Sequence, residues 1–159
     1  MALAHRPELL VLDEPSSGLD PIVRRDILGA IIRTIAHEGR TVLFSSHLLD
    51  EVEQVADHVT MISHGKAVLS APLEAIKDSH CCVTVRFAAA RPRPPEVNGV
   101  LGWNGAGPDW TAVCRDQGSG ELQAAVAGWG AQIVAERAPT LDELFFAHVG
   151  IHAASEADE

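Results

Sequence analysis

The sequence predicts an α/β fold, in which helices pack on a parallel sheet, followed by a small α+β module. Two short and largely apolar runs, Glu8–Leu12 and Thr41–Ser45, flank a segment whose apolar residues have helical spacing. Strands without polar alternation are typical of parallel sheets covered on both faces. After residue 78 a stretch rich in Pro and Gly separates shorter strands. We therefore expect two modules, residues 1–78 and 79–152, and an acidic tail, residues 153–159.

The first module is predicted to begin with the end of a helix, Ala2–Pro7, because proline does not continue a helix. After the first strand, Asp20 supplies an N-cap and Pro21 a first-turn proline. The apolar spacing that follows predicts a helix over Ile22–His37, ended at Gly39.

The two apolar runs and the helix between them form a βαβ unit, whose strands are parallel. Because these strands are apolar throughout, we expect both faces of the sheet to be buried. Helical spacing resumes over Leu48–Ala56. Val59–Ile62 and Ala67–Leu69 are then predicted to pair as a hairpin with Gly65 at positive φ, and Leu73–Lys77 to form a short helix.

The second module is predicted to be a small α+β unit. Thr140 and Glu143 have the spacing of a capping box at the start of its last helix. Its tryptophans, together with Phe145 and Phe146, are predicted to pack in the core rather than to form a ligand platform. The expected elements are strands over Cys82–Phe87, Trp110–Cys114 and Gln132–Glu136, helices over Leu122–Trp129 and Leu141–Val149, and a loop over Arg91–Pro108.

The composition argues against several classes of function. A net charge of −10 disfavours a nucleic-acid-binding protein, because such proteins use Lys and Arg to neutralise phosphates. No apolar run approaches the ~20 residues of a transmembrane helix, so we expect no direct membrane span. The eight histidines show no metal-ligand spacing, and the three cysteines, two of them adjacent, fit a reducing cytoplasm.

Acidic and histidine side chains follow the two predicted parallel strands. Asp13 and Glu14 come directly after the first strand, and His47 comes just after the second. Ligands of α/β sheets bind at the carboxyl ends of the strands, so we expect these side chains to converge on one edge. One carboxylate can hold Mg²⁺ while the other reaches a water, and a histidine can donate to a phosphate oxygen. Taken alone, the two acids could equally end the strand, and the histidine could be a cap or a surface residue.

The longer pattern that contains these residues is more specific. It reads LLVLDEPSSGLDP over residues 9–21 and SSHLLDEVE over residues 45–53. This pattern resembles the Walker B segment, the D-loop and the switch-histidine loop of ABC transporter ATPases. The resemblance implies a partial P-loop NTPase-like sheet for residues 1–78. It also implies a cytoplasmic subunit that binds and hydrolyses ATP to power transport.

The same resemblance implies roles for individual residues, with ATP and Mg²⁺ as cofactors. Asp13 would help to hold Mg²⁺. Glu14 would position or activate the hydrolytic water, and His47 would contact the γ-phosphate. The D-loop, which in the family crosses the interface with a second ATPase subunit, would comprise Ser16, Ser17, Gly18, Leu19 and Asp20.

Beyond residue 78 the resemblance is looser. The run APTLDELFF over residues 138–146 resembles the carboxyl-terminal extension of ABC-2 type exporter ATPases, including those for drugs and antibiotics. This resemblance implies an exporter. Its ATPase would be attached to the inner face of the cell membrane through transmembrane permease subunits.

Three family motifs do not occur in the 159 residues. One is the phosphate-binding G-x-x-x-x-G-K-[ST], since the only Gly-Lys pair, Gly65-Lys66, lies in the predicted hairpin. The others are the glutamine loop and the Leu-Ser-Gly-Gly-Gln signature. We therefore expect the carboxyl-terminal part of such an ATPase, with exposed apolar surface, low stability and no ATP hydrolysis by itself. The alternative is a non-catalytic interaction or dimerisation module derived from such an ATPase.

Overall fold

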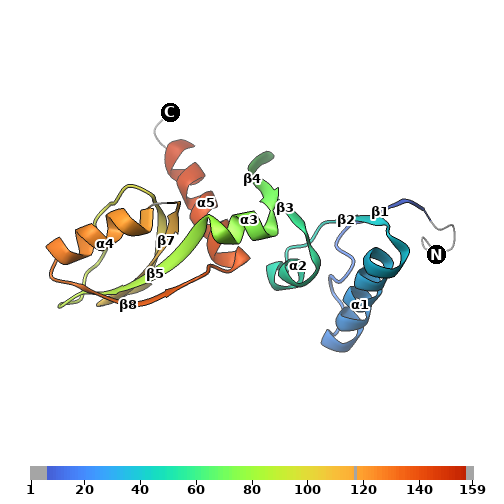
Figure 1. Cartoon of the computed structure of the whole chain (residues 1–159), viewed down its shortest axis with the longest axis horizontal. Helices are drawn as coiled ribbons and strands as arrows, with labels where there is room; N and C mark the ends of the chain where they lie inside the picture. Colours follow the sequence, from blue (N-terminus) through green and yellow to red (C-terminus); the bar gives the residue numbers. More distant parts are fainter. Residues whose placement is uncertain (1–6, 117, 157–159) are drawn as a thin grey trace. The chain divides into compact units, whose positions relative to one another are not determined.

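The computed structural model describes residues 7–116 and 118–156, which form two compact units (Figure 1). The first unit extends to Ala56 and the second begins at Asp57. The hairpin predicted within the first module therefore groups with the second unit. The predicted boundary between the modules 1–78 and 79–152 refers to the end of the family's nucleotide-binding domain, and it stays a prediction. Residues 2–6 of the predicted helix end and the last three residues of the predicted tail lie outside the described residues.

The first unit is a βαβα arrangement. Its two strands pair in parallel, with a register that runs from Leu9 opposite Thr41 to Leu12 opposite Phe44. This pairing is the one expected for a βαβ unit, while the wider P-loop NTPase-like sheet stays a prediction. The elements are β1 (Leu9–Leu12), α1 (Pro21–Glu38), β2 (Thr41–Phe44) and α2 (Leu49–Val55).

Both ends of α1 follow the predicted capping pattern. The Asp20 side chain accepts hydrogen bonds from the backbone N–H groups of Ile22 and Val23, at 3.0 and 3.2 Å. Gly39 has a left-handed backbone, with φ of 62°, and its N–H donates to the Ile35 carbonyl. These contacts satisfy backbone groups that have no partner within the helix. The predicted limits of this helix are confirmed to within one residue at each end.

One face of the two-stranded sheet is exposed. Leu10 and Ile31 are buried, whereas the exposed fractions of Leu9, Val11 and Leu43 are 53%, 63% and 60%. Successive side chains of a strand point to opposite faces, so these three residues share the uncovered face. The prediction that both faces are buried is therefore wrong for this chain. The predicted exposure of apolar surface is confirmed.

The second unit begins with the predicted hairpin. β3 (His58–Ser63) and β4 (Lys66–Pro72) pair antiparallel, and α3 (Leu73–Asp78) follows. The two turn residues, His64 and Gly65, both have positive φ, at 48° and 74°. Two central residues with positive φ are typical of a type I′ turn, whose twist matches that of the strands.

A four-stranded antiparallel sheet forms the rest of the second unit, in the order β6-β7-β5-β8. Helices α4 and α5 both pack against it. No helix within the described ranges is long and apolar enough to cross a bilayer. The elements are β5 (His80–Arg86), β6 (Val100–Ala106), β7 (Asp109–Arg115), α4 (Gly118–Gly128), β8 (Gln132–Arg137) and α5 (Leu141–Glu156).

Strand β6 lies inside the segment predicted as a loop, so that prediction is wrong for residues 100–106. Its glycines read as turn signals, but Gly105 lies where another backbone comes too close for a side chain. A Cβ atom on Gly102 would make an ordinary contact, 3.4 Å from the Cα of Ala147 in α5. A Cβ atom on Gly105 would lie 2.4 Å from the carbonyl oxygen of Asp109. A glycine inside a strand often marks such an approach by another backbone.

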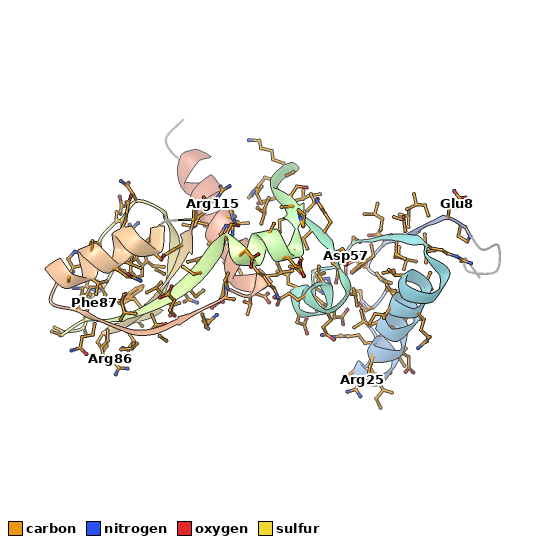
Figure 2. All side chains as sticks on the ribbon, in the orientation of Figure 1. Glu8, Arg25, Asp57, Arg86, Phe87 and Arg115 are labelled. Atoms are coloured by element: carbon orange, nitrogen blue, oxygen red, sulfur yellow. The ribbon has the colours of Figure 1, made fainter. Side chains whose placement is uncertain are left out.

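The core on the α4 side of the sheet includes the tryptophans, as predicted. Phe87, labelled in Figure 2, stacks on Trp129 with ring centroids 5.7 Å apart. Trp103 and Trp110 pack against the same cluster. Phe146 is 71% exposed, so its predicted packing role is wrong. The buried residues of the cluster are Val83, Val85, Phe87, Ala112, Cys114, Leu122 and Val126.

Two of the three cysteines are buried. Burial raises the pKa of the Cys82 and Cys114 thiols to about 12. Both thiols therefore stay protonated at neutral pH, and a protonated thiol is a poor nucleophile.

The last helix carries the predicted capping box. The backbone N–H of Thr140 donates to Glu143 at 2.9 Å, and that of Glu143 donates to the Thr140 hydroxyl at 3.3 Å. The predicted end at Val149 is wrong, because α5 continues to Glu156. Ala153 and Ala154 favour helix, and no proline lies between Val149 and Glu156, so residues 153–156 are helical, while the acidic tail stays a prediction.

Glu143 also binds Arg137 through both carboxylate oxygens. The Arg137 guanidinium lowers the pKa of Glu143 to about 2, with help from the Thr140 N–H. This contact stabilises the fold fully above the ordinary carboxyl pKa, near 4.5, and is lost as the pH falls through 2.

Glu143→Gln is therefore expected to lower the melting temperature at pH 7 by roughly 4 to 8 °C, for a loss of about 1 kcal/mol. The difference from the wild type should shrink as the pH falls from 5 to 2. Tryptophan fluorescence measures it, because Trp103, Trp110 and Trp129 all lie in the second unit. Asp142→Asn, at an exposed neighbour, is the control, and a difference that stays constant from pH 5 to 2 would contradict the assignment.

Candidate functional site

The carboxyl ends of β1 and β2 bring the predicted site residues together. The parallel register places Leu12 opposite Phe44, and the Ser45 N–H donates to the Leu12 carbonyl at 3.0 Å. The residues that follow each strand therefore leave the sheet side by side. Asp13 and Glu14 come from β1, and His47 comes from the segment after β2.

Ser45 joins the two strand ends through its hydroxyl group. This hydroxyl donates to the Asp13 carboxylate at 2.5 Å and accepts from the Glu14 backbone N–H at 2.9 Å. One side chain thus fixes the Asp13 carboxylate and the Glu14 backbone at once.

Glu14 and His47 are in direct contact. The Nδ1 atom of His47 lies 2.6 Å from Oε2 of Glu14, and the imidazole is largely exposed. The expected convergence of the histidine with an acid is thus observed. Glu14 has a φ of 46°, a left-handed conformation that a non-glycine residue adopts at a cost of order 1–3 kcal/mol. The surrounding contacts hold it there and aim its carboxylate at the histidine.

The segment after Glu14 forms a tight turn that leads into α1. The Ser17 N–H donates to the Glu14 carbonyl at 3.1 Å, and the Leu19 N–H donates to the Ser16 carbonyl at 3.4 Å. Ser17 and Gly18 are exposed, and Gly18 has a φ of 72°. A side chain at Gly18 would meet no neighbouring atom, so backbone conformation alone favours glycine there.

A buried carboxylate lies behind this turn. Glu51 of α2 is only 3% exposed, and it accepts a hydrogen bond from Ser16, which is 2% exposed. Its other oxygen lies 3.2 Å from Nε of Arg24 in α1. Buried carboxylates in proteins are normally paired in this way.

Two residues of this arrangement were missed as site residues by sequence reasoning. Glu51 left a signal, because Leu48, Glu51, Val52 and Val55 have the spacing of one helix face, and a charge within an apolar stripe needs a partner. Ser45 left none, because a serine at a strand end is also an ordinary boundary residue.

Asp13 offers only part of a magnesium site. Its carboxylate and the Ser45 hydroxyl form an oxygen set of the kind that Mg²⁺ prefers, and Asp13 is exposed. Mg²⁺ is usually held by one or two carboxylates together with substrate phosphates, so these residues fit a partial site. Within residues 7–116 and 118–156, no group of three or more His, Cys, Asp or Glu could hold a metal ion.

The second unit contains a cavity of about 460 Å³ with a different lining. Trp103 and Trp110 border it, and Arg93 and Glu96 lie at its rim. None of the predicted site residues lines it. The candidate site therefore consists of the strand ends in the first unit.

Comparison with known proteins points to one kind of protein. No protein-family model matches the chain. An ABC transporter ATP-binding protein of Alkalihalophilus pseudofirmus is 44% identical over 78 residues, which are 49% of this chain and 29% of that protein. The bacitracin transport ATP-binding protein BcrA of Bacillus licheniformis is 46% identical over 77 residues, 48% of this chain and 25% of BcrA.

A third relative has a similar match. The lantibiotic transport ATP-binding protein SrtF of Streptococcus pyogenes is 46% identical over 69 residues, 43% of this chain and 30% of SrtF. The chain thus spans less than a third of the length of these three relatives, and about half of the chain is matched.

Proposed function

We propose that this chain belongs to the ATP-hydrolysing subunit of an ABC transporter, because about half of the chain is homologous to ATP-binding proteins of such transporters. Asp13 would bind Mg²⁺, Glu14 would act on the hydrolytic water, and His47 would contact the γ-phosphate. The observation that carries the proposal is the contact between Glu14 and His47 at the ends of two parallel strands.

The geometry supports this division of roles. In ATP hydrolysis, a water molecule would attack the γ-phosphorus atom of bound Mg-ATP. The Glu14 carboxylate can accept a proton from that water. When Nδ1 of His47 donates to Glu14, Nε2 can donate to a phosphate oxygen only if the ring is doubly protonated. A ring that donates from both nitrogens would carry a positive charge, which suits a developing phosphate charge.

The partners follow from the same premise. Ser16 to Asp20 would form a D-loop that meets a second ATPase subunit, and the pair would power transmembrane permease subunits from the inner face of the membrane. BcrA and SrtF are named for bacitracin and lantibiotic transport. These names support transport, and the run over residues 138–146 supports an exporter.

A second candidate is a non-catalytic module that binds an intact ATPase. The uncovered apolar face of Leu9, Val11 and Leu43 favours it, because such a face calls for a covering partner. The same face also suits an ATPase whose remaining sheet covers it. Nucleotide binding separates the two candidates.

The test is titration of a fluorescent ATP analogue with Mg²⁺. The tag is placed after Glu159 and the protein is purified from its own cells, so that any residues preceding Met1 are retained. We expect saturable binding that Asp13→Ala weakens, and ATP turnover that His47→Ala lowers by about 100-fold. His58→Ala, an exposed histidine of the second unit, is the control.

The outcomes distinguish the candidates. Absence of nucleotide binding by this protein would reject the ATPase and favour the interaction module. The 159-residue chain expressed alone is expected not to bind saturably, because it contains no phosphate-binding loop motif. If the 159-residue chain alone binds the analogue saturably, and Asp13→Ala and His47→Ala both abolish that binding, then this chain builds a complete nucleotide site.

A further inference from the structure

Both ends of the turn after Glu14 are attached to one carboxylate. At the first end, the Ser16 hydroxyl donates to Oε2 of Glu51 at 2.5 Å. At the other end, the Leu19 carbonyl accepts from Nη2 of Arg24 at 3.4 Å, and Nε of the same arginine lies 3.2 Å from Oε1 of Glu51. The four residues 16–19 therefore form an arch with two feet. Glu51 holds the first foot by a hydrogen bond and reaches the second through its ion pair with Arg24, in which Nε and Oε1 make no hydrogen bond.

The position of Glu51 links this arch to the histidine. Glu51 lies in the first turn of α2, four residues after His47. Ser16 lies two residues after Glu14. The two segments are thus joined twice, once by the contact of Glu14 with His47 and once by the buried contact of Ser16 with Glu51. Because hydrogen bonds between buried groups are costly to break, the second contact is the firmer one.

We propose that Glu51 is a positioning residue, which holds the arch of residues 16–19 and thereby the direction of the Glu14 carboxylate. The proposal rests on the proposed function for its catalytic consequence.

The structural part of the proposal is testable on this chain by hydrogen exchange. The Ser17 amide donates to the Glu14 carbonyl and the Leu19 amide to the Ser16 carbonyl, so both report on the arch. Ser16→Ala weakens the first foot and Glu51→Gln weakens both, and each variant is expected to accelerate exchange of these two amides by about fivefold or more. The amides of β1 and α1 should keep their wild-type rates. Asp50→Asn, at the exposed neighbour on the same helix, should change neither set.

A merely structural role gives a different result. The proposal would be overturned if exchange accelerated equally at all amides of the first unit, or if it did not accelerate at the amides of Ser17 and Leu19. Ser16→Ala removes a single oxygen, so it provides the test even if Glu51→Gln prevents folding.

The catalytic part is measured on the whole protein as kcat and KM for ATP. Glu51→Gln and Ser16→Ala are each expected to lower kcat by about tenfold with KM unchanged, and the double variant should be no worse than the poorer single variant. If Glu14→Gln abolishes turnover while Glu51→Gln and Ser16→Ala keep the wild-type kcat, the positioning role of Glu51 is rejected and the proposed function stands. If Glu14→Gln leaves turnover intact, the proposed function fails, and the exchange result still decides whether Glu51 holds the arch.

Discussion

Glu14→Gln is expected to lower the kcat of ATP hydrolysis by the whole protein by about 100-fold or more. Proton transfer to a positioned carboxylate contributes roughly 10²- to 10⁴-fold to catalysis, and an amide does not accept that proton. Glutamine has nearly the same shape, and its oxygen can still accept from Nδ1 of His47, so the geometry of the site is retained. Phosphate release at saturating Mg-ATP measures the effect, and nucleotide affinity should change by less than about threefold.

Glu8→Gln is the matched control for this experiment. Glu8 is an exposed glutamate just before β1, labelled in Figure 2, and its backbone carbonyl accepts from Thr41. The substitution removes the same charge from the same part of the chain without touching the strand ends. Turnover by Glu14→Gln above half the control value would reject the catalytic role of Glu14.

Leu122→Ala is expected to destabilise the second unit by about 3 kcal/mol, which lowers its melting temperature by roughly 12 to 24 °C. Leu122 of α4 is fully buried in the cluster with Val83, Val85 and Cys114. Truncation loses the transfer free energy of three carbon atoms and leaves a cavity that the sheet does not fill. Thermal unfolding followed by tryptophan fluorescence measures the change.

Phe146→Ala is the control for the loss of a large apolar side chain. Because Phe146 is 71% exposed, its truncation should cost less than about 0.5 kcal/mol, or about 4 °C. Equal effects of the two substitutions would mean that Leu122 does not lie in the core of this unit.

Local signals in the sequence predicted most elements. Asp20, Pro21 and Gly39 set the ends of α1, and Thr140 with Glu143 set the start of α5, because capping uses only neighbouring residues. Strand β6 was missed because Gly102 and Gly105 look like turn residues, whereas their extended conformation depends on pairing with β7. The extension of α5 to Glu156 was missed because a charged tail and a charged helix end have similar composition.

The site likewise combines features that local sequence predicts with features that depend on distant residues. The order of strand, acids, strand and histidine predicted that Glu14 and His47 would converge, since parallel strands end at one edge. The identity of the connecting groups needed the tertiary structure. Ser45 and Glu51 act through partners that lie between 27 and 35 residues away, and no spacing rule specifies such partners.

The sequence by itself determined the α/β character, the parallel pairing of β1 with β2, and the residues at the strand ends. These features depend on apolar periodicity, caps and chain order, which are local properties. Only the tertiary structure decided that one face of that sheet is uncovered, that Glu14 adopts a left-handed backbone against His47, and that Glu51 is buried behind the arch. The physical reason is that burial and hydrogen-bond partners depend on which distant segments meet, and the same side chain is exposed or paired according to what covers it.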